Sequence, residues 1–264
     1  MSEDRPPSAP PPAPEDLRDR LEALRKGRGF LLAHHGALAA SAPDLHAAYM
    51  QMYEALTVRP RHLTPLQRES VWLAILVVAR EGIGTHHLKL YRDAGGTEAA
   101  AHTIIAMAGA AALGDALTFA RTHWHDYVPA LDPAAAYGEA LARLRGEDVP
   151  PDTAELCMLA AQAARHSAEG VAHHVRAAYR AGIAEDKMVE ALSYVIWPCG
   201  VNAFLDACTA WHDVMTAGEV TPSARFRVWA DMPREGAYDV SSGTDVGGFS
   251  ASASTSPSER EDGT

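Results

Sequence analysis

Between its two ends, nearly the whole chain has the hydrophobic pattern of helices. One helix is predicted from Thr64, where an N-cap threonine precedes a proline, an early glutamate and several apolar turns. A counterpart starts at Pro151, with Asp152 or Thr153 as its cap. No sustained alternation of apolar and polar residues bounded by turn dipeptides indicates a strand. The pattern therefore predicts an all-α protein.

The predicted helices follow the same order twice. Each of these two helices is followed by a short break, a helix that opens on two histidines and ends at Gly95 or Gly182, and a long apolar helix. A glycine at the end of a helix suits a left-handed C-cap. The long apolar helices are predicted over 98–124 and 185–211. Three further helices are predicted over 14–26, 42–56 and 133–146.

A constant offset relates the two halves. His173 − His86 and Gly182 − Gly95 both give 87, and the same offset carries Trp124-His125-Asp126 onto Trp211-His212-Asp213. Pairs of histidines and matching Trp-His-Asp triplets in one register indicate an internal duplication. Each copy is a small helical bundle whose apolar faces need a partner, and the other copy is the obvious one.

These features divide the chain into two units and two tails. We expect a first unit over 15–130, which includes the N-terminal helices, and a second over 131–230. The proline-rich start (1–14) and the Ser/Gly-rich end (231–264) carry too few apolar side chains to offset chain entropy, so both are predicted to be disordered.

Composition and net charge limit the classes of binding partner and the expected location of the protein. The net charge of −11 argues against a nucleic-acid partner, because phosphate binding requires a basic face. No apolar run of about 18 residues predicts a membrane span, and the N-terminus lacks an apolar signal core, so a cytoplasmic protein is expected. Three cysteines without a pattern do not form a disulfide framework.

The order of the elements resembles the carboxymuconolactone decarboxylase and alkylhydroperoxidase-like family. Many members have a glutamate, a Cys-x-x-Cys pair that starts twelve residues later, and a histidine four residues after the second cysteine. In the second copy these positions are Glu155, Ser167, Gly170 and His174, so the spacing is kept and both cysteines are missing. In the first copy, Glu69 and His87 are 18 residues apart instead of 19.

The resemblance implies chemistry without thiols. The peroxidase members use the cysteine pair, which serine and glycine cannot replace. The decarboxylase branch uses acid/base catalysis with no metal or organic cofactor, on an activated lactone carboxylate. The resemblance therefore favours an acid/base enzyme acting on a small organic acid or lactone. Its catalytic residues would be His174 and Glu155, with His87 and Glu69 as the first-copy equivalents. The family's assembly implies a homo-oligomer, most simply a trimer of two-unit chains.

Other residues are candidates for substrate binding. Arg176 could hold a substrate carboxylate, and the interrupted helix around Pro198 could line an apolar pocket with Tyr194, Trp197 and Cys199. For Arg176, the structural alternative is a solvated face of the helix.

Two alternatives stay open. The chain could be a non-catalytic member whose helical oligomer binds a small molecule or a protein. A metal site is the other alternative, because His166, Glu169 and His173 would share one face of a continuous helix. The break expected between Ser167 and Gly170 argues against it.

Overall fold

The computed structural model describes residues 12–232, and within that range the regular secondary structure is entirely helical. Its helices run in the order α1 (Pro14–Arg28), α2 (Ala33–Ser41), α3 (Pro43–Tyr53), η1 (Glu54–Val58), α4 (Pro65–Ala79), η2 (Ile83–Thr85), α5 (His86–Asp93), α6 (Glu98–Gly109), α7 (Ala112–Trp124), α8 (Pro133–Arg145), α9 (Pro151–Ala164), α10 (Ala168–Arg180), α11 (Glu185–Ser193), α12 (Ile196–Cys199), α13 (Val201–Thr216) and α14 (Ala224–Asp231). The prediction of an all-α fold is confirmed. Most of the two predicted disordered tails lies outside the described residues.

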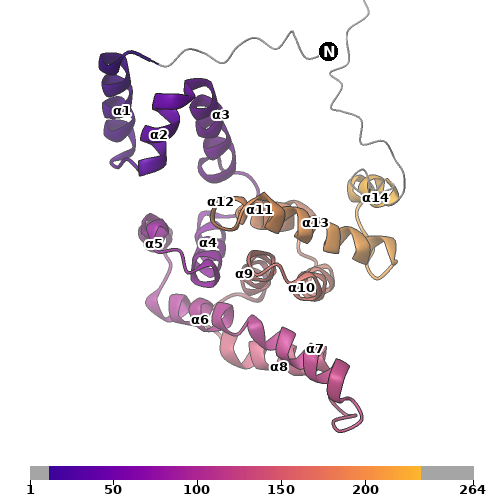
Figure 1. Cartoon of the computed structure of the whole chain (residues 1–264). Helices are drawn as coiled ribbons and strands as arrows, with labels where there is room; N and C mark the ends of the chain where they lie inside the picture. The colour runs from indigo at the N-terminus through magenta and orange to yellow at the C-terminus, as the bar shows by residue number, and fades with distance from the viewer. Residues whose placement is uncertain (1–11, 233–264) are drawn as a thin grey trace, which may run out of the picture.

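Two helices form the centre of the molecule. α4 and α9 pack against each other, and nearly every residue from Gln67 to Leu76 and from Thr153 to Ala163 is buried. Figure 1 shows the pair surrounded by α5 and α6 on one side and α10, α11 and α13 on the other. The start of α4 is fixed by a capping box between Thr64 and Gln67, with Pro65 in the first turn. The core thus lies between the two predicted units.

The order of the helices repeats along the chain. α4, α5, α6 and α7 are followed after the linking helix α8 by α9, α10, α11 and the pair α12–α13. The predicted boundary between the units falls in the turn between α7 and α8, at 125–132. The helices α1 to α3 form a separate layer at one end, shown in indigo and purple at the top left of Figure 1.

Both long apolar helices are interrupted: the sequence predicted one helix over 98–124, whereas Pro198 already indicated an interruption in 185–211. A turn at Ala110 and Ala111 separates α6 from α7. The second predicted helix is divided into three, where Pro198 lacks the backbone N–H that continues a helix and Gly200 adopts a φ of 86°. After these breaks, α6, α11, α12 and α13 each contact α4 or α9, whereas α7 packs mainly against α8.

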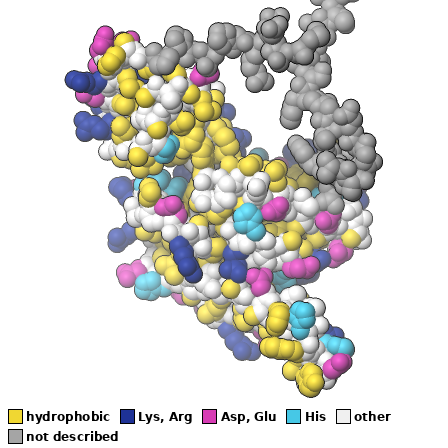
Figure 2. All heavy atoms as spheres, viewed as in Figure 1, with side chains coloured by type: hydrophobic (Ala, Val, Ile, Leu, Met, Phe, Trp, Pro, Cys, Tyr) yellow, Lys and Arg dark blue, Asp and Glu magenta, His cyan; other side chains and the backbone are white. Residues whose placement is uncertain are grey.

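The helices α6 and α7 are apolar over much of their length. Taken together, Glu98–Trp124 is long and apolar enough to cross a membrane by length and composition, which differs from the sequence expectation that no segment is. Much of this surface is exposed, including Ile105, Phe119 and Trp124. Figure 2 shows hydrophobic side chains in yellow at the lower tip, where Figure 1 places the end of α7. An exposed face of this kind also suits an interface between chains.

Candidate functional site

Glu155 and His174 meet across the break between α9 and α10. His166 adopts a left-handed conformation with a φ of 56°, which ends α9 and turns the chain. The side chain of Ser167 then caps α10 by accepting a hydrogen bond from the backbone N–H of Gly170 at 3.2 Å. This turn places the two helices side by side, and His174 Nδ1 lies 2.5 Å from Glu155 Oε1.

A chain of hydrogen bonds continues behind His174. The Nε2 atom of Gln162 lies 3.0 Å from the carbonyl oxygen of Ala111 and 2.7 Å from the hydroxyl of Tyr137. A carbonyl can only accept, so this atom is the amide nitrogen, and it donates to both oxygens. Tyr137 is left to donate its own hydrogen to His174 Nε2 at 3.2 Å. His174 therefore carries its hydrogen on Nδ1 and donates it to Glu155.

Burial shifts the pKa values of two side chains beside this series of hydrogen bonds. It raises the pKa of Tyr137 well above the usual value of 10.0, so the phenol stays neutral. Burial also lowers the pKa of His173 to about 4, with a smaller contribution from the adjacent His174. At neutral pH both side chains next to His174, Tyr137 and His173, are therefore uncharged.

The carboxylate of Glu155 faces a cavity of about 400 Å³, which we call the Glu155 cavity. The side chain of Glu155 is 22% exposed and that of His174 only 2%, so the carboxylate is in front and the imidazole behind it. Apolar side chains from α6, α8 and α9 form part of the wall: Met107, Leu141 and Met158. Two cations from α8 and α10 also line it: Arg145 and Arg180. This cavity can hold a small molecule with an apolar body and an anionic group.

A second cavity, of about 450 Å³, lies on the other side of the hydrogen-bond chain. We call it the Gly170 cavity; Tyr137, Gln162, His173 and Arg176 are among its lining residues. A Cβ atom added at Gly170 would lie 2.4 Å from Cδ of Gln162, so the amide occupies the space of a side chain at that position. Tyr137 thus connects the Gly170 cavity to His174, and His173 lines both cavities.

Comparison with known proteins identifies the family of this site. Residues 130–213 match the sequence model of the carboxymuconolactone decarboxylase family. The second unit is a carboxymuconolactone decarboxylase family domain. The matched residues contain Tyr137, Glu155, Gln162 and His174. No curated protein and no solved structure matches the chain. The first unit lies outside the matched residues, so its relation to the family rests on the repeated spacing and the repeated order of helices.

The chain departs from the cysteine-containing family pattern at two positions of this decarboxylase-family domain. Ser167 donates a hydrogen bond to Asp115 at 2.9 Å while it caps α10, and Gly170 leaves room for Gln162. The sites of the thiol pair are therefore occupied by a helix cap and a side-chain amide. The chain's own cysteines lie elsewhere, on α9, α12 and α13: Cys157, Cys199 and Cys208.

The first unit also brings its glutamate and histidine together. His87 Nδ1 lies 2.7 Å from Glu69 Oε2 despite the missing residue. Arg80 takes a left-handed conformation with a φ of 54°, and the short helix η2 follows, so the break between α4 and α5 absorbs the difference. The side chains of Glu69 and His87 are 2% and 8% exposed. Trp72 stacks on His87 at 4.2 Å between ring centroids, which covers the pair.

The predicted substrate-binding residues do not line the Glu155 cavity. Tyr194 donates a hydrogen bond to Glu190 at 2.7 Å and stacks on Trp72 beside the first-unit pair. Trp197 packs against Tyr49 of α3 at 4.8 Å between centroids. Cys199 packs against the hydrophobic core at the end of α12. The interrupted helix around Pro198 therefore lies next to the first unit and the N-terminal layer.

Arg176 lies on α10 and lines the Gly170 cavity, and its Nε is 2.5 Å from Glu219 Oε2. Sequence reasoning assigned the substrate carboxylate to it, whereas the arginines in the Glu155 cavity are Arg145 and Arg180. Arg176 and Arg180 lie one helical turn apart on α10. Which of the two borders the Glu155 cavity depends on where α8 packs, and the sequence spacing does not show this. Tyr137 and Gln162 were missed for the same reason.

The structure does not bring the proposed metal ligands into one group. The left-handed turn at His166 precedes the start of α10, which separates it from Glu169 and His173. His166 instead lies 3.0 Å from Asp206 on α13. Within residues 12–232, no three His, Cys, Asp or Glu side chains are placed to hold a metal ion.

Proposed function

We propose that the second unit is an acid/base catalyst that acts on a small organic acid or lactone without using a thiol. The observation that carries the proposal is the position of the Glu155 carboxylate, which faces the Glu155 cavity while His174 supports it from behind. A carboxylate held by a buried imidazole is a competent proton donor and acceptor.

The cavity also suits the substrate class. Arg180 forms no hydrogen bond or ion pair within residues 12–232, so its guanidinium is available to a substrate carboxylate. Arg145 is partly engaged by the carbonyl oxygen of Val149 at 3.2 Å. Met107 and Met158 offer an apolar surface to the rest of the molecule. A small organic anion fits this combination.

Decarboxylation in this cavity would need one proton. Cleavage of the bond to the carboxylate carbon releases CO₂, and the neighbouring carbon keeps the electron pair. Glu155, a carboxylate at rest, takes the proton of His174 Nδ1–H and delivers it to that carbon. Tyr137 then donates to His174 Nε2 and takes a proton from solvent in the Gly170 cavity. The hydrogen-bond directions at rest already run toward Glu155, so the chain is arranged for proton delivery.

The test is turnover of a panel of carboxylated γ-lactones and β-keto acids, measured as CO₂ release. Glu155→Gln should lower kcat at least about a hundredfold, which is the usual loss when a general acid is removed. Arg180→Ala should raise KM about tenfold through the lost charge-assisted contact. Tyr137→Phe should lower kcat and leave KM unchanged.

Glu139→Gln is the matched control. Glu139 lines the same cavity but is exposed and paired with Arg143 at 3.1 Å, so turnover should stay at the level of the native protein. Equal turnover by Glu155→Gln and the native protein would refute the catalytic proposal. Carboxylate binding that depends on Arg180 without any turnover would instead favour the non-catalytic alternative, a helical oligomer that binds a small molecule.

A further inference from the structure

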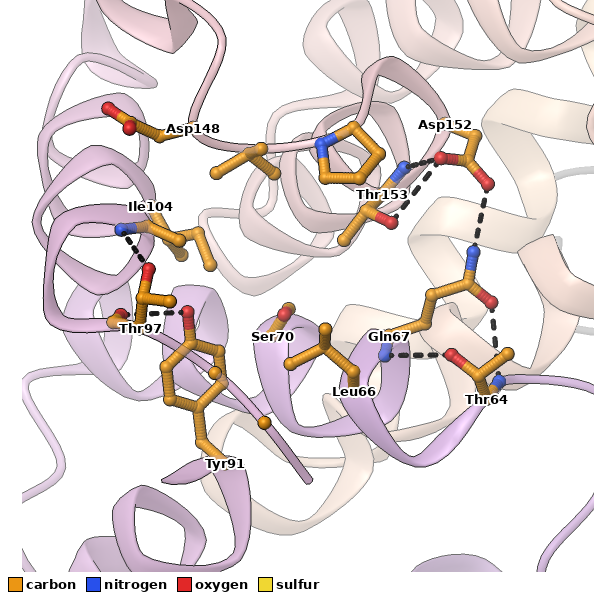
Figure 3. Close-up of a pocket in the computed structure, with 15 residues that line it drawn as sticks. Thr64, Leu66, Gln67, Ser70, Tyr91, Thr97, Ile104, Asp148, Asp152 and Thr153 are labelled. Carbon is orange, nitrogen blue, oxygen red and sulfur yellow. Dashed lines mark hydrogen bonds between the residues drawn. The ribbon is translucent and has the colours of Figure 1, made fainter. Parts of the chain in front are cut away.

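A third cavity, of about 320 Å³, has a lining that includes neither Glu–His pair and shares no residue with the Glu155 cavity. It is enclosed by α4, the turn before α6, and the segment that leads into α9; we call it the α4–α6 cavity. Figure 3 shows Ser70 in the middle of the lining, with Tyr91 and Ile104 on one side and Leu66 and Gln67 on the other. Its volume is at the lower end of the roughly 300–1,000 Å³ of small-molecule sites.

Ser70 is a buried polar group without a partner. It is 2% exposed, and its hydroxyl has no hydrogen-bond partner within residues 12–232; the oxygen is not among the fully enclosed unpaired atoms, so it is open to the cavity that Ser70 lines. A serine inside a helix commonly bonds back to the carbonyl of the preceding turn, and Ser70 does not. Because buried hydroxyls are normally paired, an unpaired one that borders a cavity indicates a group that binds there.

The second unit fills the corresponding place. Ser70 and Leu156 are related by the same offset as Glu69 and Glu155, since 156 − 70 and 155 − 69 both give 86. Leu156 is 1% exposed in the core. At another position of the lining, Ala100 corresponds to Lys187, with an offset of 87. Smaller side chains in the first unit therefore leave space that its copy uses for packing.

The charges around the α4–α6 cavity indicate which charge a ligand can carry. Two carboxylates line it, Asp148 and Asp152, and Figure 3 places them on opposite sides of Ser70. Asp152 accepts hydrogen bonds from Gln67 at 2.9 Å and from the backbone of Thr153 at 2.8 Å. The lining contains no lysine, arginine or histidine. An anion would be repelled by these two carboxylates, whereas a cation would be attracted.

We propose that the α4–α6 cavity binds a small, non-anionic hydrogen-bond donor, an amine or alcohol with an apolar body of about one ring. Its donor meets Ser70 Oγ, and its apolar body lies against Tyr91 and Ile104. The site is separate from the Glu155 cavity, whose arginines suit an anion, so the proposal does not depend on the function proposed above.

Four probes that share one ring test the proposal: benzylamine, benzyl alcohol, benzoate and toluene. Saturation-transfer NMR and calorimetry on the full chain give their affinities. Benzylamine and benzyl alcohol should bind at least about tenfold more tightly than benzoate and toluene, which lack a suitable charge or donor. Binding is assigned to the α4–α6 cavity when the Ser70→Leu variant no longer binds the probe. This substitution introduces leucine, the residue at the corresponding position of the second unit.

Two milder variants keep the test decisive if Ser70→Leu fails to fold. Ser70→Ala should weaken both donor probes several-fold without closing the cavity. Asp148→Asn should weaken benzylamine more than benzyl alcohol, because it removes the charge and keeps an acceptor for the hydroxyl of Thr103, which donates a hydrogen bond to Asp148 at 3.2 Å. Ser41→Ala, a serine on exposed α2 surface, is the control and should bind like the native protein. Absence of binding by both donor probes, or equal binding by benzoate in this cavity, overturns the proposal.

Discussion

The side-chain amide of Gln162 occupies the place of a side chain at Gly170. An ideal Cβ at Gly170 would lie 2.4 Å from Cδ of Gln162 and 2.6 Å from its Oε1. Gln162 in turn orients Tyr137 through the 2.7 Å hydrogen bond. The absence of a side chain at one position of the family's cysteine pair is therefore a condition for the hydrogen-bond chain that leads to Glu155.

Gly170→Ala should lower the free energy of unfolding by about 1–3 kcal/mol, because Gln162 must move and lose its two hydrogen bonds. Urea unfolding followed by circular dichroism measures the change. Gly36→Ala is the matched control: Gly36 lies inside α2 with nothing within 4 Å of an added Cβ. That variant should gain about 0.5–1 kcal/mol. Equal effects of the two substitutions would contradict the role of Gln162.

The two Glu–His pairs should respond differently to substitution. His174→Ala should abolish the turnover of any substrate that the Glu155 cavity accepts, because the support of the exposed carboxylate is lost. His87→Ala should cost less activity and mainly stability, about 1–3 kcal/mol, since Glu69 stays buried with Arg68 as its remaining partner. Steady-state kinetics and urea unfolding of both variants measure the losses of activity and of stability. Inactivation by His87→Ala alone would reverse the assignment of the two copies.

Stability should fall when the pH is lowered from about 6.5 to about 4, partly because of His173. Its pKa in the folded protein is about 4, below its usual value of 6.5, chiefly through burial. In this interval the unfolded chain binds a proton that the folded protein does not, so protonation favours unfolding. The contribution is complete above pH 6.5 and is lost by about pH 4.

Urea unfolding at pH 7 and pH 5 tests this behaviour. His173→Gln should reduce the difference in unfolding free energy between the two pH values. His35→Gln should do the same independently, because burial and neighbouring charges also lower the pKa of His35 to about 4. His102→Gln, at an exposed position on α6, serves as the control and should keep the native difference. An unchanged difference in His173→Gln contradicts the prediction.

The cysteines should be poor nucleophiles in the folded protein. Burial raises the pKa of Cys208 to about 11 and raises the pKa of Cys157 and Cys199 as well, so little thiolate is present at pH 7. Iodoacetamide should label Cys157 only after unfolding, which mass spectrometry can follow. Replacement of all three by alanine should leave turnover in place, and peroxide reduction should be absent from both proteins. Thiol-dependent peroxidase activity would contradict the proposed function.

The chain should form a homo-oligomer, most simply a trimer. Trp211 is fully buried and packs against Phe226 and Trp229, both on α14, whereas its first-unit counterpart Trp124 is 53% exposed. Together with Phe119 on the same helix, Trp124 leaves an apolar face that a second chain could cover. Light scattering at micromolar concentration gives the mass, and Phe119→Asp should reduce it. A mass equal to one chain for the native protein would rule out the assembly.

The sequence by itself determined the helical class and the contact between Glu155 and His174. The spacing from Glu155 to His174 is set within two adjacent helices and one break, so a local pattern was sufficient. The apolar period and the Ala-Gly helix ends are equally local. Each of these features depends on residues less than about 20 positions apart, where helix geometry alone fixes which side chains meet.

The tertiary structure decided everything that depends on packing between distant helices. Tyr137 reaches His174 from α8, and Gln162 binds the carbonyl of Ala111, 51 residues away. Packing also turned Arg180 toward the Glu155 cavity and placed Trp197 beside the N-terminal layer instead. Side-chain volumes at Ser70 and Gly170 matter only through neighbours that the chain brings in from elsewhere. Helix periodicity tells which face is buried, and the relative placement of helices determines what each buried face meets.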